Sequence, residues 1–111
     1  MKVYVFNTLI VPCDFGFCDQ FTVKFRKIDK EKAKEILKNN EFVSAVGHQA
    51  TADVLTAILG VQIPMNRIAV KMDKGDVGVH FFLKQRLPEG AVLGKEDLER
   101  LEYDLILSEV N

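Results

Sequence analysis

Two helical segments with clear boundaries separate the apolar stretches of this 111-residue chain. Asp29, a favoured N-cap residue, comes directly before a helical pattern at residues 30–39. A second helical pattern, residues 49–59, stops at Gly60, a residue type that readily takes the left-handed backbone found after a helix. Because apolar strand-like stretches precede, separate and follow these helices, the order predicts a single α/β domain over residues 1–111. We expect a mixed β-sheet of about five strands flanked by helices.

The expected strands consist of apolar or alternating side chains. They span residues 2–8, 21–27, 67–72, 77–84 and 104–110, with a further short stretch at 42–46 and a short helix at 95–101. Residues 21–27 alternate in polarity, which is typical of a half-buried strand. The turn-forming residues 73–76 predict a hairpin between the strands on either side of them. Residues 85–94 contain one proline and two glycines and are expected to form a loop.

The composition is that of a globular protein with few extremes, because 48% of the residues are apolar and 28% are charged. No apolar run approaches the roughly 20 residues of a membrane helix, and the apolar start is too short for a signal peptide. We therefore expect a cytoplasmic protein that makes no contact with a membrane. The net charge of −1 argues against binding of long nucleic acid. Residues 1–90 hold 13 basic and 10 acidic side chains, a balance that favours a small anionic ligand.

The two cysteines, Cys13 and Cys18, do not form a C-x-x-C pair. Neither has a histidine or a second cysteine pair nearby to complete a zinc site. We expect two free thiols, with a short disulfide as the alternative in an oxidising compartment. Elsewhere the histidines and carboxylates lack metal-ligand spacing, so the sequence predicts no metal and no other cofactor.

The segment around His48 places an imidazole where a helix begins. An imidazole can gain or lose a proton near neutral pH, which suits a general acid. The unpaired N–H groups at a helix start attract phosphate, and Gly47 allows close approach of a ligand to the backbone. Gln49 and Thr51 add polar groups within the first turn. Two interpretations of His48 remain: a catalytic residue, or an N-cap or core residue with a structural partner.

A second polar segment, residues 84–90, reads KQRLPEG. An arginine such as Arg86 can bind a phosphate oxygen through two hydrogen bonds and stabilise charge during displacement. Glu89 could orient that guanidinium or hold a ribose hydroxyl, and Gln85 adds an amide. The alternative is an ordinary surface turn with an Arg–Glu ion pair. If this segment and His48 face one pocket, the chain has the groups needed to cleave a phosphodiester without a metal.

Polar residues also follow the first predicted strand. Asn7 and Thr8 lie at its end, where ligands often gather in α/β sheets. Their alternative role is to form a turn. His80 lies within an expected strand, which favours a structural role, and Arg67 begins another expected strand and is interpreted as structural.

Taken in order, these segments resemble the viral ring nuclease family. The resemblance rests on the patterns G-H-x-[AS]-T and Q-R-x-P-E-G, with residues 60–67 (GVQIPMNR) between them. Asn7 and Thr8 after the first strand add to it, so it spans nearly the whole chain. Members of this family are small anti-CRISPR proteins of archaeal viruses, with relatives in bacteriophages, prophages and bacteria.

The resemblance implies a homodimer that binds cyclic tetra-adenylate, the second messenger of type III CRISPR systems. Such an enzyme cleaves the ring to linear di-adenylate with 2′,3′-cyclic phosphate ends and silences the defence. The positions that match as catalytic residues are His48, Arg86 and Glu89. Those that match as ligand-binding residues are Asn7, Thr8, Gly47, Gln49, Thr51 and Gln85. The loop at residues 11–19, which contains both cysteines, matches no pattern of the family.

Two further hypotheses come from other functional classes. The same polar groups suit a module that binds a cyclic nucleotide to sequester or sense it without cleavage. A structural viral protein with no nucleotide site is the third reading. General RNA cleavage is a weaker fourth, because the near-neutral charge disfavours binding of a long polyanion.

Overall fold

A computed structural model of the chain describes residues 1–16, 18–84 and 95–111. Within these residues, five strands form one sheet in the order β2-β5-β4-β1-β3. The strands are β1 (Val3–Phe6), β2 (Val23–Ile28), β3 (Phe42–Ala45), β4 (Val77–Leu83) and β5 (Tyr103–Val110). Strand β1 runs parallel to β3 and β4, whereas β5 is antiparallel to β4 and β2. The predicted mixed sheet is confirmed.

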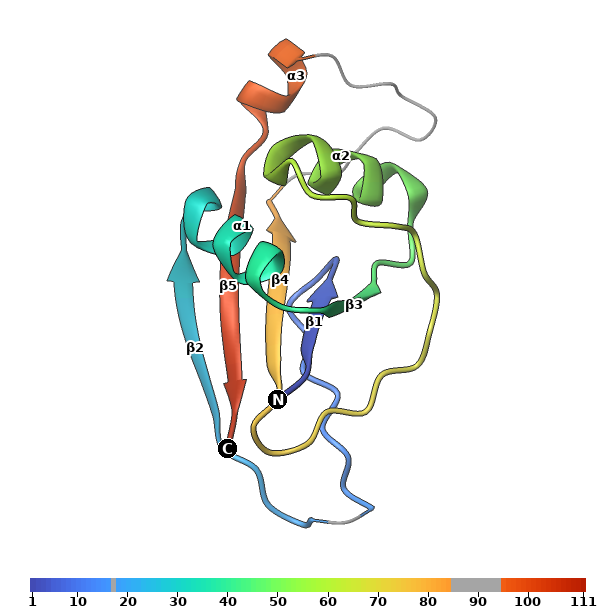
Figure 1. The fold of residues 1–111 in the computed structure, drawn as a ribbon, viewed down its shortest axis with the longest axis vertical. Helices are drawn as coiled ribbons and strands as arrows, with labels where there is room; N and C mark the ends of the chain where they lie inside the picture. The colour runs from blue at the N-terminus through green and yellow to red at the C-terminus, as the bar shows by residue number, and fades with distance from the viewer. Residues whose placement is uncertain (17, 85–94) are drawn as a thin grey trace.

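Three helices accompany the sheet in the described part of the chain: α1 (Lys30–Asn39), α2 (Gln49–Leu59) and α3 (Lys95–Arg100). Helices α1 and α2 lie on the same face of the sheet, and α3 lies beyond the start of β5 (Figure 1). Helix α1 begins as predicted because the Asp29 carboxylate accepts a hydrogen bond from the Lys32 backbone N–H at 2.8 Å. Helix α2 ends as predicted because Gly60 adopts a left-handed φ of 65°. None of the described helices is long and apolar enough to cross a membrane.

The helix-covered face of the sheet holds the larger core. Side chains of the strands and of the two longer helices pack together there, among them Val3, Val5, Ala33, Leu37, Val46, Leu55, Val79, Phe81, Leu105 and Leu107. Along β4 this set takes alternate residues, so Val79 and Phe81 point to the helices. His80 and Phe82 therefore point to the opposite face, which we call the loop-covered face.

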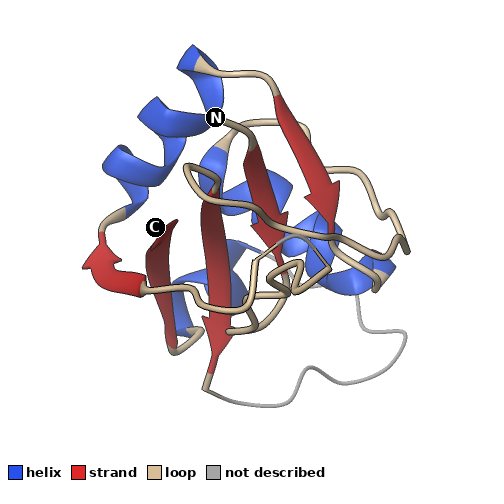
Figure 2. Cartoon of the chain, turned by 90° about the horizontal axis from the view of Figure 1, so that it is seen from below, coloured by secondary structure: helices blue, strands red, loops and turns tan. Residues whose placement is uncertain are grey.

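The loop-covered face is only partly buried. Tyr4 and Phe6 are covered there by loop side chains, among them Val11, Cys13, Phe21, Val70 and Met72. Other large apolar side chains on this side stay exposed, and Phe25 and Phe82 keep 50% and 40% of their surface in solvent. Loops also gather at the end of the sheet where both chain termini lie, which is the lower end in Figure 1 and faces the viewer in Figure 2.

The predicted strand at 67–72 is wrong, and so is the hairpin built on it. In that stretch only Met72 pairs with another segment, through a single bridge to Cys13. The turn at 73–76 does form, with the Asp76 N–H donating to the Asp73 carbonyl at 3.1 Å. The physical reason is that β4 has no free edge for a hairpin partner, because β1 and β5 occupy its two edges.

Three further predictions concern residues 42–46, the two cysteines and residues 85–94. The short stretch at 42–46 is a true strand, β3, at the edge of the sheet beside β1. Both cysteines are free thiols, and burial raises the pKa of Cys13. The loop expected at residues 85–94 lies outside the described residues.

Candidate functional site

The sheet topology brings several predicted site residues to one edge. Strands β1, β3 and β4 are parallel, so their carboxyl ends point the same way (Figure 1). Phe6 at the end of β1 pairs with Ala45, the last residue of β3. Asn7 and Thr8 therefore leave the sheet beside the segment that carries Gly47 and His48. Ligands of α/β sheets bind at this kind of edge.

His48 lies at the start of α2 with an exposed side chain. Its backbone is extended and its carbonyl accepts the first helical hydrogen bond, from the Ala52 N–H at 3.0 Å. The imidazole makes no capping hydrogen bond, and the first turn of α2 contains no acidic residue. The first turn of α2 thus places no carboxylate of its own against the positive end of the helix dipole. His48 is thus the N-cap residue of α2 by position, but its side chain does not cap the helix.

The other predicted site residues at the start of α2 differ in exposure and in hydrogen bonding. Thr51 is half-buried in the first turn. Gln49 is exposed, but its side-chain amide donates to the Asp53 carboxylate at 2.8 Å, one turn along the helix. That bond engages one of the two N–H groups of the Gln49 amide.

Arg67 lies against Gly47, a placement that sequence reasoning missed. Its Nε–H donates to the Gly47 carbonyl at 2.8 Å. A Cβ added at Gly47 would lie 3.3 Å from Arg67 Cγ, so a larger residue there would crowd the arginine. The Nε bond orients a guanidinium beside the start of α2. A cation and a helix N-terminus side by side form a favourable environment for an anion.

The segment that carries Arg67 is tied to β3 by several hydrogen bonds. The Ser44 hydroxyl donates to the Pro64 carbonyl at 2.6 Å, and the Asn66 side-chain amide donates to the Ser44 carbonyl at 2.8 Å. The Asn66 N–H also donates to the Val46 carbonyl at 2.7 Å. Ser44 is 4% exposed, so these are well-shielded bonds that hold the chain next to the end of β3. The pattern MNR alone carries no signal of this contact, since its partners lie about 20 residues away.

Asn7 and Thr8 project from the end of β1. Asn7 is half-buried and Thr8 is exposed. The Thr8 carbonyl accepts a hydrogen bond from His80, with Nδ1 and the oxygen 3.1 Å apart. His80 itself is fully buried in β4, which agrees with the structural role expected from its place in a strand.

Strand β4 ends next to a small charge cluster. The Asp104 carboxylate lies 3.2 Å from Lys27 Nζ and 3.4 Å from Lys84 Nζ. The hydrogen bond from Lys27 is the main reason why the pKa of Asp104 lies below its usual value, and both lysine charges add to it. Gln85, Arg86 and Glu89 lie outside the described residues, so their approach to His48 stays a prediction.

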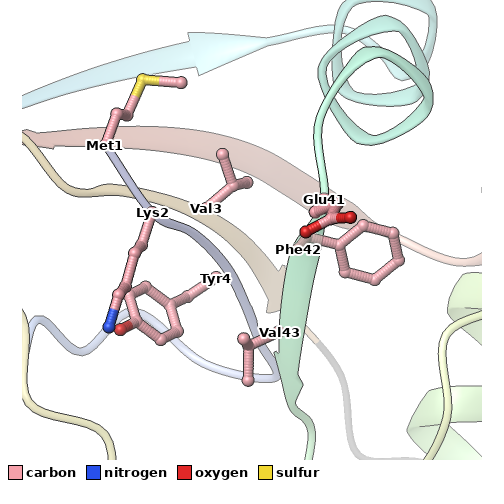
Figure 3. A pocket seen from close by; sticks show the side chains of 7 residues that line it. All are labelled: Met1, Lys2, Val3, Tyr4, Glu41, Phe42 and Val43. Atoms are coloured by element: carbon pink, nitrogen blue, oxygen red, sulfur yellow. The ribbon is translucent and has the colours of Figure 1, made fainter.

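Two cavities of about 320 Å³ lie away from the His48 side chain. One is lined by residues 1–4 and 41–43, at the amino ends of β1 and β3 and thus at the opposite end of these strands (Figure 3). The other is apolar and borders the predicted site, since Phe6 and Ala45 line it together with Ile10, Pro12, Ile68, Ala69 and Val70. In the part of the chain that the structure describes, no three histidine, cysteine or carboxylate side chains group as metal ligands would.

Comparison with known proteins identifies a family that matches this chain. A family model described as STIV B116-like matches residues 3–105, nearly the whole chain. The chain belongs to the STIV B116-like family. B116 of Sulfolobus turreted icosahedral virus has a solved structure with a similar fold, at a TM-score of 0.78 and 25% sequence identity. That alignment covers 98% of this chain and 99% of B116.

Relatives of this B116-like chain occur in archaeal viruses and in a bacterium. Protein 26 of Sulfolobus islandicus filamentous virus is 42% identical over 109 residues, covering 97% of this chain and 91% of the relative. ORF117 of Acidianus two-tailed virus is 43% identical over 108 residues, covering 93% of this chain and 88% of the relative. YddF of Bacillus subtilis is 32% identical over 109 residues, covering 96% of this chain and 95% of the relative. The B116-like family is thus a viral protein family with a bacterial relative.

Proposed function

We propose that this protein is a metal-independent ring nuclease that binds cyclic tetra-adenylate and cleaves it to linear di-adenylate, antagonising type III CRISPR signalling. One observation carries the proposal. An exposed imidazole with no capping bond stands at the start of α2, next to the tethered Arg67 and the strand-end residues Asn7 and Thr8. The sequence resemblance to viral ring nucleases supplies the substrate.

The chemistry follows from these groups. A ribose 2′-hydroxyl attacks the adjacent phosphorus in line, so that a new O2′–P bond forms while the P–O5′ bond breaks. The hydroxyl proton passes to water, and His48 donates a proton to the departing 5′-oxygen. Arg67 and the N–H groups at the start of α2 stabilise the negative charge on the non-bridging oxygens. The product strand ends in a 2′,3′-cyclic phosphate. In this proposal Arg86 and Glu89 complete the catalytic group, and Gln85 contributes to ligand binding.

The symmetry of the ring supports the homodimer that forms part of this proposal. A two-fold dimer would present two copies of each catalytic group to opposite phosphates of a four-nucleotide ring. A 111-residue monomer has little concave surface with which to enclose such a ligand.

A cleavage assay tests the proposal. The protein is incubated in EDTA with labelled rings of three, four and six adenylates, and the products are separated by chromatography. We expect linear di-adenylate with cyclic phosphate ends from the four-membered ring. Binding of that ring without any product would instead identify a sequestering or sensing module. Absence of both binding and cleavage would leave a structural viral protein.

A further inference from the structure

His80 makes two contacts that lie on either side of Asn7 in the chain. Its ring stacks on Phe6, with centroids 4.9 Å apart and planes 11° apart. Its Nδ1 lies 3.1 Å from the Thr8 carbonyl oxygen. One imidazole therefore holds the residue before Asn7 and the residue after it. The conformation of this strand end depends on the ring directly.

The hydrogen bonds define which nitrogen carries the proton. A carbonyl oxygen only accepts, so Nδ1–H must be the donor to Thr8. Nε2 lies 2.7 Å from the Ser108 hydroxyl, and in a neutral ring it accepts the hydroxyl proton. Burial lowers the pKa of His80 and keeps the ring neutral, although the Thr8 bond partly opposes this. The Thr8 carbonyl thus fixes the tautomer, and the Ser108 hydroxyl, which can donate or accept, donates to Nε2.

Space for this pair exists because residue 78 is a glycine. A Cβ at Gly78 would lie 2.6 Å from both His80 Nε2 and Ser108 Oγ, closer than side-chain atoms approach. His80 and Ser108 are both 0% exposed. They resemble a nucleophile and its base in their spacing, yet no substrate can reach them. Their chemistry is available only for holding other residues in place.

We propose that His80 is a positioning residue that sets the conformation of Asn7 and Thr8 for ligand binding. The inference rests on the proposed function, because it assigns these two residues to the ligand site. His80 acts through the Thr8 carbonyl and the Phe6 ring, and Ser108 acts through His80. Loss of the Nδ1 donor is expected to weaken ligand binding more than it slows the bond-breaking step.

Two substitutions separate positioning from simple packing. In His80→Asn the side-chain amide nitrogen takes the place of Nδ1 and still donates to Thr8, while the contact with Ser108 is lost. In His80→Gln the longer side chain takes the place of Nε2 and reaches Ser108, while Thr8 loses its donor. Both variants lose the stacked ring, so they serve as matched controls for packing. Thermal unfolding of both confirms that each is folded at the assay temperature.

The full-length variants are assayed with labelled cyclic tetra-adenylate. We expect His80→Gln to raise KM about tenfold, the effect of one lost hydrogen bond, with kcat nearly unchanged. His80→Asn should stay within about threefold of the unsubstituted protein in KM. Nitrogen-15 NMR of the unsubstituted protein should show His80 with a protonated Nδ1 and an unprotonated Nε2.

Three results would overturn the inference: equal KM values in both variants, a larger KM in His80→Asn than in His80→Gln, or a proton on Nε2 in the NMR spectrum. Failure of the proposed function has a different signature. In that case the unsubstituted protein itself neither binds nor cleaves the ring, and both proposals fall together.

Discussion

The two histidines of the chain occupy opposite environments. His48 is exposed at the start of α2 and makes no capping hydrogen bond, whereas His80 is fully buried in β4 and both its ring nitrogens have partners. An exposed ring can exchange a proton with a bound ligand, and a buried ring with two bonds cannot. In the proposed function, the same residue type therefore takes part in catalysis at one position and supports the framework at the other.

The two environments meet at the same edge of the sheet. His80 reaches the strand end through Thr8, and His48 follows the neighbouring strand β3. The buried histidine thus lies close to the proposed ligand site. The following experiments test whether the two roles can be separated.

The largest expected effect is on catalysis at His48. Replacement by alanine should slow cleavage of cyclic tetra-adenylate by about 10²–10⁴-fold, because the leaving oxygen loses its general acid. Thermal stability should change little, since the side chain makes no capping bond. Single-turnover cleavage and thermal unfolding measure the two effects. Unchanged turnover would remove His48 from the mechanism.

A substitution beside the buried histidine should act on stability. In Gly78→Ala the new Cβ collides with His80 Nε2 and Ser108 Oγ at 2.6 Å. Overpacking of this kind costs about 1–3 kcal/mol of unfolding free energy. Urea denaturation measures the loss. A midpoint equal to that of the unsubstituted protein would show that the imidazole does not fill this space.

Arg67 should affect binding at the exposed site without affecting the buried one. Replacement by alanine removes a guanidinium beside the start of α2 and should weaken ring binding about tenfold. The matched control is Arg26→Ala on the far edge strand β2, where the Arg26 guanidinium lies 3.4 Å from the Glu109 carboxylate of β5. Titration with labelled ring compares them. Equal affinities for both variants would contradict the role given to Arg67.

The start of α1 provides a control for the start of α2. Asp29 occupies the position that His48 occupies in α2, but its carboxylate caps the helix at 2.8 Å. Asp29→Ala should lower the unfolding free energy by about 1 kcal/mol and leave cleavage at the level of the unsubstituted protein. Urea denaturation and the cleavage assay measure both. A loss of activity at full stability would show that α1 also touches the ligand.

The smallest expected effect is a pH dependence of stability that comes from His80. Its pKa is lowered in the folded protein, so the unfolded chain binds more protons between that value and about 6.5. Stability should therefore fall as the pH drops from about 6.5 through the folded pKa, and His80→Asn should remove this part of the slope. Asp104, whose pKa is lowered from 3.8, contributes only at more acidic pH. Identical slopes in both proteins between pH 7.5 and 5.5 would contradict the assignment.

Local signals explain which parts of the fold could be predicted. Helices α1 and α2 have the predicted bounds because Asp29 and Gly60 act within one helical turn of their own positions. The exposed position of His48 at a helix start follows from the same short-range pattern. The mixed sheet also follows from the order of strands and helices.

Strand pairing and long-range contacts could not be predicted in this way. Residues 67–72 have a strand-like composition, but β1 and β5 already occupy the two edges of β4. Arg67 reaches Gly47, 20 positions away, only because residues 64–66 are bonded to β3. The convergence of Arg86 and Glu89 with His48 stays a prediction, since both lie outside the described residues.

The sequence by itself determined the helix boundaries, the class of fold and the candidate proton donor, because each depends on residues within a few positions of one another. Only the tertiary structure decided which strand pairs with which, where Arg67 lies, and that His80 holds the end of β1. Those features depend on free strand edges and on contacts between distant segments, and such contacts exist only once the sheet has assembled.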